Sequence, residues 1–173
     1  GRMATLGLDD EQQRVLERQH REFVQAGARL GEPQKRRCSQ IVERLAGLAT
    51  TFSQNVLADE AAFQLVLRDP ADLAGLPDFV RATARQAARD RGIDDAWVIT
   101  LARSSVEPFL TFSDRRDLRE HVHQAWVHRG ETPGRDNRPI VIEMLALRRE
   151  LAQLHGYADF ACYALSDRMA GHP

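Results

Sequence analysis

The chain has 173 residues, which fits one domain, and its 43% hydrophobic and 28% charged residues are typical of a soluble globular protein. Its 25 acidic and 24 basic residues balance, so the basic excess of a nucleic-acid-binding protein is missing. The sequence shows no signal peptide and no apolar run near the ~18 residues of a membrane span. Cys38 and Cys162 lie in no CxxC pattern. We therefore expect a cytoplasmic protein with reduced thiols and without a nucleic-acid or membrane partner.

The chain is expected to form a single helical domain over residues 9–173, after an arbitrary or disordered start at 1–8. Asp9 is a plausible cap for a first helix, because Asp10 and Glu11 follow it at the electropositive N-terminus. The apolar residues of this amphipathic helix recur at seven-residue steps, at Leu16, Phe23 and Leu30.

A long helix over 33–60 forms the spine of the predicted fold. Its large apolar residues form one stripe: Ile41, Leu45, Leu48, Phe52 and Val56. The short turn at Gly31-Glu32-Pro33 predicts that the two helices make an antiparallel hairpin over 9–60. A homodimeric coiled coil is the alternative, but it needs a longer uninterrupted repeat.

A mixed segment is predicted over 61–112. Residues 96–101 are the best strand candidate and 63–67 their best partner, which gives one small two-stranded ribbon. A helix follows Pro77 and ends before Gly92, and a short helix that Pro108 interrupts follows the ribbon.

Helices fill the rest of the chain, over 113–170. Ser113 is expected to cap the first of them, residues 130–138 form a loop, and Pro139 begins the next helix. A last helix runs through Phe160 to Met169. The predicted fold class is therefore mainly α, with a long antiparallel helical hairpin packed against further helices and one small two-stranded β-ribbon.

No cluster of residues with an evident catalytic or metal-binding pattern stands out. His121 and His123 lie on opposite sides of a helix, and His128 lies two turns from His121, too far to share one ion. Ser104-Ser105 could suggest a nucleophile, but no glycine elbow surrounds them, and helix capping is the simpler role. We expect the paired arginines to be solvated or to form salt bridges: Arg115-Arg116 and Arg148-Arg149. The residues alone therefore assign no catalytic residue and no metal ligand, and they leave substrate-binding residues unknown.

Four stretches in order nevertheless resemble the thimet-oligopeptidase family of zinc metallopeptidases, closest to its oligopeptidase A and bacterial peptidyl-dipeptidase branch. They are LATTFSQNVLADE, LAGLPDF, ITLARSSVEPFLTFSDRRDLRE and DNRPIVIEMLALRRELAQLHGYADFACYALSDRMA. The individual positions that match the family pattern are Phe52, Asn55, Asn137, Arg138, Pro139, Leu145, Leu147, Arg148, Glu150, Leu154, Gly156, Tyr157, Met169 and Ala170.

The resemblance implies a neurolysin-like helical segment in the wall of the channel that admits short peptides. Zinc and the His-Glu-x-x-His helix of the family would belong to the full-length parent, because no such motif occurs in this chain. We thus expect an interior, catalytically inactive segment of a cytoplasmic oligopeptidase, whose partner is the missing catalytic region. The alternative is a stand-alone helical binding module.

Residues 140–169 carry more apolar side chains than one stripe per helix can use. Val141, Ile142 and Leu145 lie off the stripe of Ile140 and Met144. We therefore expect an exposed apolar face here, which allows self-association.

Overall fold

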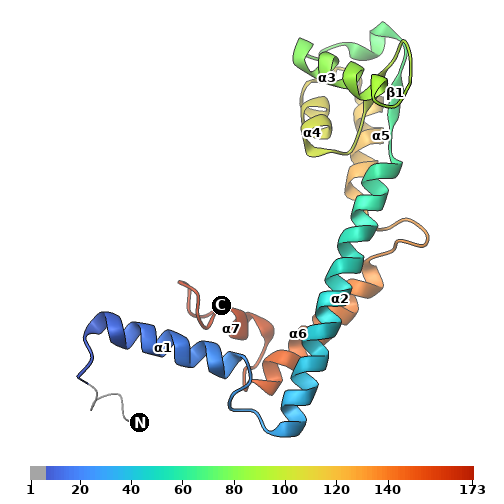
Figure 1. Cartoon of the computed structure of the whole chain (residues 1–173). Helices are drawn as coiled ribbons and strands as arrows, with labels where there is room; N and C mark the ends of the chain where they lie inside the picture. The colour runs from blue at the N-terminus through green and yellow to red at the C-terminus, as the bar shows by residue number, and fades with distance from the viewer. Residues whose placement is uncertain (1–6) are drawn as a thin grey trace. The chain divides into compact units, whose positions relative to one another are not determined.

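The computed structural model describes residues 7–173, so the expectation for the start of the chain lies largely outside the described residues. These residues form two compact units (Figure 1). Unit 1 comprises the chain up to Leu48 together with Ile142–Pro173, and unit 2 comprises Ala49–Val141. The single domain over 9–173 stays a prediction. No helix within residues 7–173 is long and apolar enough to cross a membrane.

Unit 1 contains four helical stretches. They are α1 (Asp10–Gln25), the first part of α2 (Glu32–Ala62), most of α6 (Arg138–Leu154) and α7 (Phe160–Leu165). Asp9 caps α1 as predicted: it accepts a hydrogen bond of 2.8 Å from the Gln12 amide, while Gln12 reaches back to the Asp9 amide.

Antiparallel ion pairs join α2 and α6 within unit 1. Arg37 makes a two-pronged contact with Glu150, at 2.6 and 2.8 Å, and Arg44 makes one with Glu143, at 2.6 and 2.7 Å. The residue numbers of the arginines rise along α2 while those of their glutamate partners fall along α6, so the two helices run antiparallel. The buried Ile41 lies between these pairs on α2, and the buried Leu48 and Leu151 lie just beyond them on α2 and α6.

The predicted hairpin of α1 with α2 is therefore wrong. No residue of α1 is buried, and Leu16 and Phe23, expected to face α2, are 36% and 65% exposed. Two long-range hydrogen bonds join α1 to Ser166 instead, from Arg21 and Gln25 at 3.1 Å each. The apolar period shows that a helix face requires cover, but it does not say which element covers it.

Unit 2 is built on the predicted ribbon. β1 (Leu65–Leu67) pairs antiparallel with β2 (Trp97–Ile99), with Leu65 opposite Ile99 and Leu67 opposite Trp97. Around it lie the 3₁₀ helix η2 (Pro70–Leu73) and the helices α3 (Asp78–Arg89), α4 (Arg103–Phe112) and α5 (Arg116–Val127), as Figure 1 shows. The mainly α fold with one small ribbon is confirmed.

The core of unit 2 lies between the ribbon and these three helices. Its buried members are Leu67, Leu73, Leu76, Val80, Ala84, Ile99, Leu101, Val106, Phe109 and Val122. These residues fix α4 and α5 against the ribbon, because each contributes at least one fully buried side chain.

Two local predictions in unit 2 are corrected. α4 continues through Pro108. Because proline has no N–H, only the Ser104 carbonyl at the start of the helix loses its helical hydrogen bond, and the buried Val106 and Phe109 anchor the helix on either side of Pro108. Ser113 does not cap α5, which begins at Arg116 after an Arg115 N-cap that lacks a side-chain bond. Instead the Ser113 hydroxyl accepts a bond of 3.3 Å from the Arg115 amide.

The apolar stripe of α2 is only partly buried. Ile41 is 0% exposed and Leu48 4%, whereas Phe52 is 37% exposed. Off the α6 stripe, Val141, Ile142 and Leu145 are 40%, 70% and 59% exposed. The expected apolar face of α6 therefore exists, although self-association itself stays a prediction.

Candidate functional site: a polar clamp on the 128–137 loop

The loop over residues 128–137 joins α5 to α6, and buried polar side chains hold it against α2 within unit 2. Asn137 is 5% exposed. Its amide nitrogen donates to the Phe52 carbonyl over 3.1 Å, and its amide oxygen accepts from Asn55 over 2.8 Å. The Asn137 side chain thus forms hydrogen bonds with two residues of α2 that lie about one helical turn apart. We call Asn55, Asp59 and Asn137, with the loop they bind, the polar clamp.

Gly130 lies at the closest approach within the clamp. Its carbonyl accepts a hydrogen bond from the backbone N–H of Asn137 at 2.6 Å, and its φ is +77°. A Cβ at this position would lie 2.5 Å from the Asn137 side-chain nitrogen. Only glycine therefore fits here without a shift of the loop.

Asp59 is the buried charge of the clamp, at 7% exposed. Its carboxylate accepts from the Gly130 amide and the Thr132 hydroxyl at 2.7 Å each, and it pairs with Arg135 at 2.7 Å. Burial raises the pKa of Asp59, but these two hydrogen bonds and the charge of Arg135 together lower it below its ordinary value. The carboxylate is therefore ionised, and its contacts all go to residues of the loop.

Arg129 adds a second attachment of the same loop to α2. Its guanidinium lies over the Trp126 ring, 3.3 Å from the centroid, and forms an ion pair with Glu60. Its Nε also donates to the Trp126 carbonyl at 2.8 Å. The charges on this side of α2 are thus paired with each other.

A hollow of about 230 Å³ lies beside the clamp. Apolar Phe63, Leu101 and Ala125 line one part of it, and Arg129 and Arg135 line another. Both arginines are already paired with Glu60 and Asp59. The geometry therefore supports a structural role for the clamp and offers no activated nucleophile.

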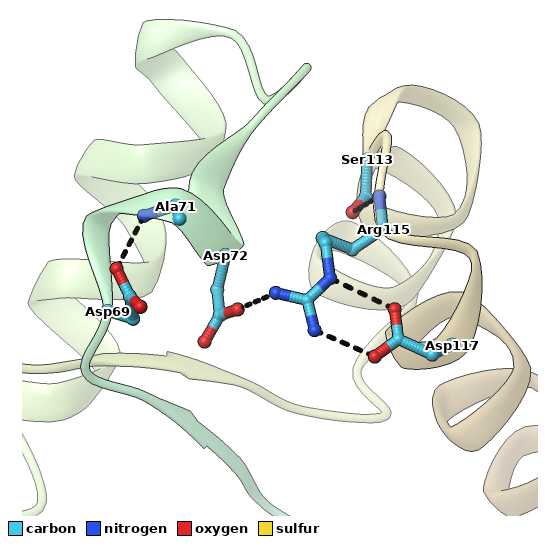
Figure 2. A network of polar contacts seen from close by, with 6 residues as sticks. All are labelled: Asp69, Ala71, Asp72, Ser113, Arg115 and Asp117. Carbon is cyan, nitrogen blue, oxygen red and sulfur yellow. Dashed lines mark hydrogen bonds and ion pairs between the residues drawn. The ribbon is translucent and has the colours of Figure 1, made fainter.

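A second polar network in unit 2 joins η2 and its cap to the start of α5 (Figure 2). Arg115 forms an ion pair with Asp72 and a two-pronged contact with Asp117, at 3.0 and 2.7 Å. Asp69 caps η2 by accepting from the Ala71 amide at 2.9 Å. The expectation that Arg115 is a salt-bridge partner is confirmed.

Gly75 lets these two stretches meet. The Asp114 amide donates to the Ala74 carbonyl at 2.9 Å, and a Cβ on Gly75 would lie 2.3 Å from the Phe112 carbonyl oxygen. The φ of Gly75 is +81°. The close approach of two backbones therefore requires glycine.

The residues considered for chemistry lie apart. The His121 ring lies tilted against the Phe63 ring, with centroids 5.6 Å apart, and His128 bonds the Gln124 carbonyl at 2.8 Å. The Ser105 hydroxyl accepts from the Thr100 amide at 3.0 Å, whereas Ala102 is the N-cap of α4. Within residues 7–173, no three His, Cys, Asp or Glu side chains converge as metal ligands would. The absence of catalytic and metal residues from the whole chain stays a prediction.

Comparison with known proteins shows which family the chain resembles. Residues 109–173 match the model of peptidase family M3. The chain is 34% identical to dipeptidyl carboxypeptidase of Escherichia coli over 99% of its own length and 25% of that protein. It is 32% identical to oligopeptidase A of Salmonella typhimurium over 96% of its length and 25% of that protein. The chain is similar to members of peptidase family M3. It spans about a quarter of the length of these relatives.

The family resemblance found in the sequence is thereby confirmed, and several of its motif positions hold elements of this chain together. Asn55 and Asn137, from two separate stretches, bond each other in the clamp. In unit 1, Glu150 pairs with Arg37, and Arg148 lies over the Phe160 ring at 5.3 Å. Asp59 is not one of the positions that match the family pattern. The feature of the sequence that could have identified it is a charged residue in phase with the apolar stripe of α2.

Replacing the buried Asn137 by alanine should destabilise unit 2 by roughly 1–3 kcal/mol, because the Phe52 carbonyl and the Asn55 side chain lose their partner. Asn55→Ala removes only one of these bonds and should cost less. Both tryptophans, Trp97 and Trp126, lie in unit 2, so urea unfolding followed by tryptophan fluorescence measures this unit alone. Equal losses for the two variants would contradict the two-point contact of Asn137.

Proposed function

We propose that this chain is a non-catalytic helical segment of a zinc-dependent oligopeptidase of the peptidyl-dipeptidase or oligopeptidase A type. In the full-length protein it would form part of the wall of the channel that admits short peptides. The observation that carries the proposal is similarity along 99% of this chain to a dipeptidyl carboxypeptidase, at 34% identity.

Zinc would belong to the remainder of such an enzyme. Residues 7–173 do not fit the ion, since a zinc site needs three or four converging ligands and no such group of side chains is present in them. The polar clamp supports a scaffold role, because its charges are neutralised by neighbours. The contribution of this segment would then be to position helices around peptides that other residues cleave.

The cytoplasm is the proposed location. A relative in Arabidopsis thaliana, named probable cytosolic oligopeptidase A, is 32% identical over 94% of this chain and supports this.

A segment exchange tests the proposal. Escherichia coli dipeptidyl carboxypeptidase whose matching quarter is replaced by this chain should retain bound zinc and hydrolyse a short quenched-fluorescent peptide. Gly130→Ala in the exchanged segment should reduce both, because a Cβ there would lie 2.5 Å from Asn137. A zinc-loaded chimera that neither binds nor cleaves short peptides would contradict the wall role.

A further inference from the structure

Unit 1 buries few apolar side chains and exposes many. Its buried hydrophobic residues are Ile41, Leu48, Leu151 and Ala152. Its exposed large hydrophobic residues are Val15, Leu16, Phe23, Val42, Ile142, Leu145 and Met169. A unit with this balance has little core of its own.

The first of two open surfaces in unit 1 is the α1 face, formed by Val15, Leu16 and Phe23. Val15 and Leu16, with Leu8, line a shallow hollow of about 480 Å³. The bonds that hold α1 come from Arg21 and Gln25 and leave this face uncovered. An isolated helix of 16 residues is marginal in water, so its amphipathic pattern implies a partner that covers the apolar side.

The second surface is the α6 face, formed by Ile142, Leu145 and Ala146, all exposed. Glu143 and Glu150 on the same helix are turned to α2, where they pair with Arg44 and Arg37. Toward the C-terminal end of α6, the exposed residues on the same side are polar, at Arg149 and Gln153. A solvated helix face is normally polar throughout, so the apolar half of this one resembles a buried contact.

We propose that the α1 face and the α6 face are the contact surface for the part of an M3 peptidase that lies outside the quarter matched by this chain. This inference rests on the proposed function. The relatives carry about three quarters of their length beyond the matched region. A partner in the same polypeptide acts at a high effective concentration, which favours it over a second copy of this chain.

A pair of double variants tests the α6 face. Ile142→Glu with Leu145→Glu should leave the isolated chain unchanged in helix content and in tryptophan-detected unfolding, because both side chains are already exposed. In the chimeric dipeptidyl carboxypeptidase, the same changes should shorten the half-life at a fixed elevated temperature by at least about tenfold. The control, Arg149→Glu with Gln153→Glu, lies on the polar half of the same side and should alter neither protein.

Two results would overturn this inference. One is an equal half-life of the chimera with and without the glutamates. The other is an isolated chain that light scattering finds dimeric and that the glutamates convert to monomer, since the occupant would then be a second copy. A chimera that the glutamates destabilise, yet that cleaves no peptide even without them, would keep the inference and count against the proposed function.

Hydrogen exchange on the isolated chain gives a test that does not depend on the chimera. The amides of α1 and of 142–154 should be protected at least about a hundredfold less than those of β2 and α4, which lie in the core of unit 2. Equal protection in both units would show that unit 1 is self-sufficient and would overturn the proposal.

Discussion

Gly75→Ala is expected to destabilise unit 2 by roughly 2–5 kcal/mol. The left-handed backbone costs an alanine about 1–2 kcal/mol. The new Cβ would also lie 2.3 Å from the Phe112 carbonyl oxygen and 2.8 Å from the Asp114 amide. Both are backbone atoms, so the two stretches must separate and strain the Arg115 network at their junction (Figure 2).

Gly134→Ala is the matched control. Its φ is +82° against +81° for Gly75, but nothing lies within 4 Å of the added Cβ. It should show only the backbone cost of about 1–2 kcal/mol. Urea unfolding followed by tryptophan fluorescence compares the two, and equal losses would show that the close approach at Gly75 contributes nothing.

Asp59→Ala is expected to cost roughly 2–4 kcal/mol. The change leaves the buried Gly130 amide without an acceptor and removes the acceptor of Thr132. It also leaves Arg135 without its carboxylate partner, although Arg135 can reach water, at 38% side-chain exposure. Glu107→Ala, which breaks the exposed pair with Arg103, should cost under about 1 kcal/mol.

The contribution of Asp59 should also depend on pH in one direction. Because its folded pKa lies below the ordinary value of 3.8, its stabilisation is fully present above that value. It is lost as the pH falls through the folded pKa. The gap in unfolding free energy between the parent and Asp59→Ala should therefore be constant from neutral pH down to about 5 and shrink below 3.8. A gap that widens on acidification would contradict the ionised carboxylate.

Local features of the fold were predictable from the sequence. Strand-forming residues at 96–101 and 63–67 indicated the ribbon, which pairs at 97–99 and 65–67, and Asp9 indicated the start of α1. The partner of α2 was not predictable, because the ion pair of Arg37 with Glu150 joins residues 113 positions apart. Charge complementarity at such separation has many solutions in a chain with 24 basic and 25 acidic residues.

The clamp illustrates the same limit at the site. Asn55 and Asn137 were selected by resemblance, yet nothing in the sequence said that they bond each other across 82 positions. Asp59 was overlooked as a site residue. It lies three positions after Val56, in phase with the apolar stripe of α2, and a carboxylate at such a position requires a buried partner. That partner, the Gly130 amide, becomes apparent only in the folded loop.

The zinc content of the isolated chain tests the central claim most directly. The purified 173-residue protein would be incubated with zinc, dialysed against metal-free buffer and assayed for metal and for cleavage of a quenched-fluorescent peptide. The account predicts far less than one zinc per chain and no turnover, because no three ligands converge in residues 7–173. One tightly held zinc per chain together with peptide hydrolysis would contradict it.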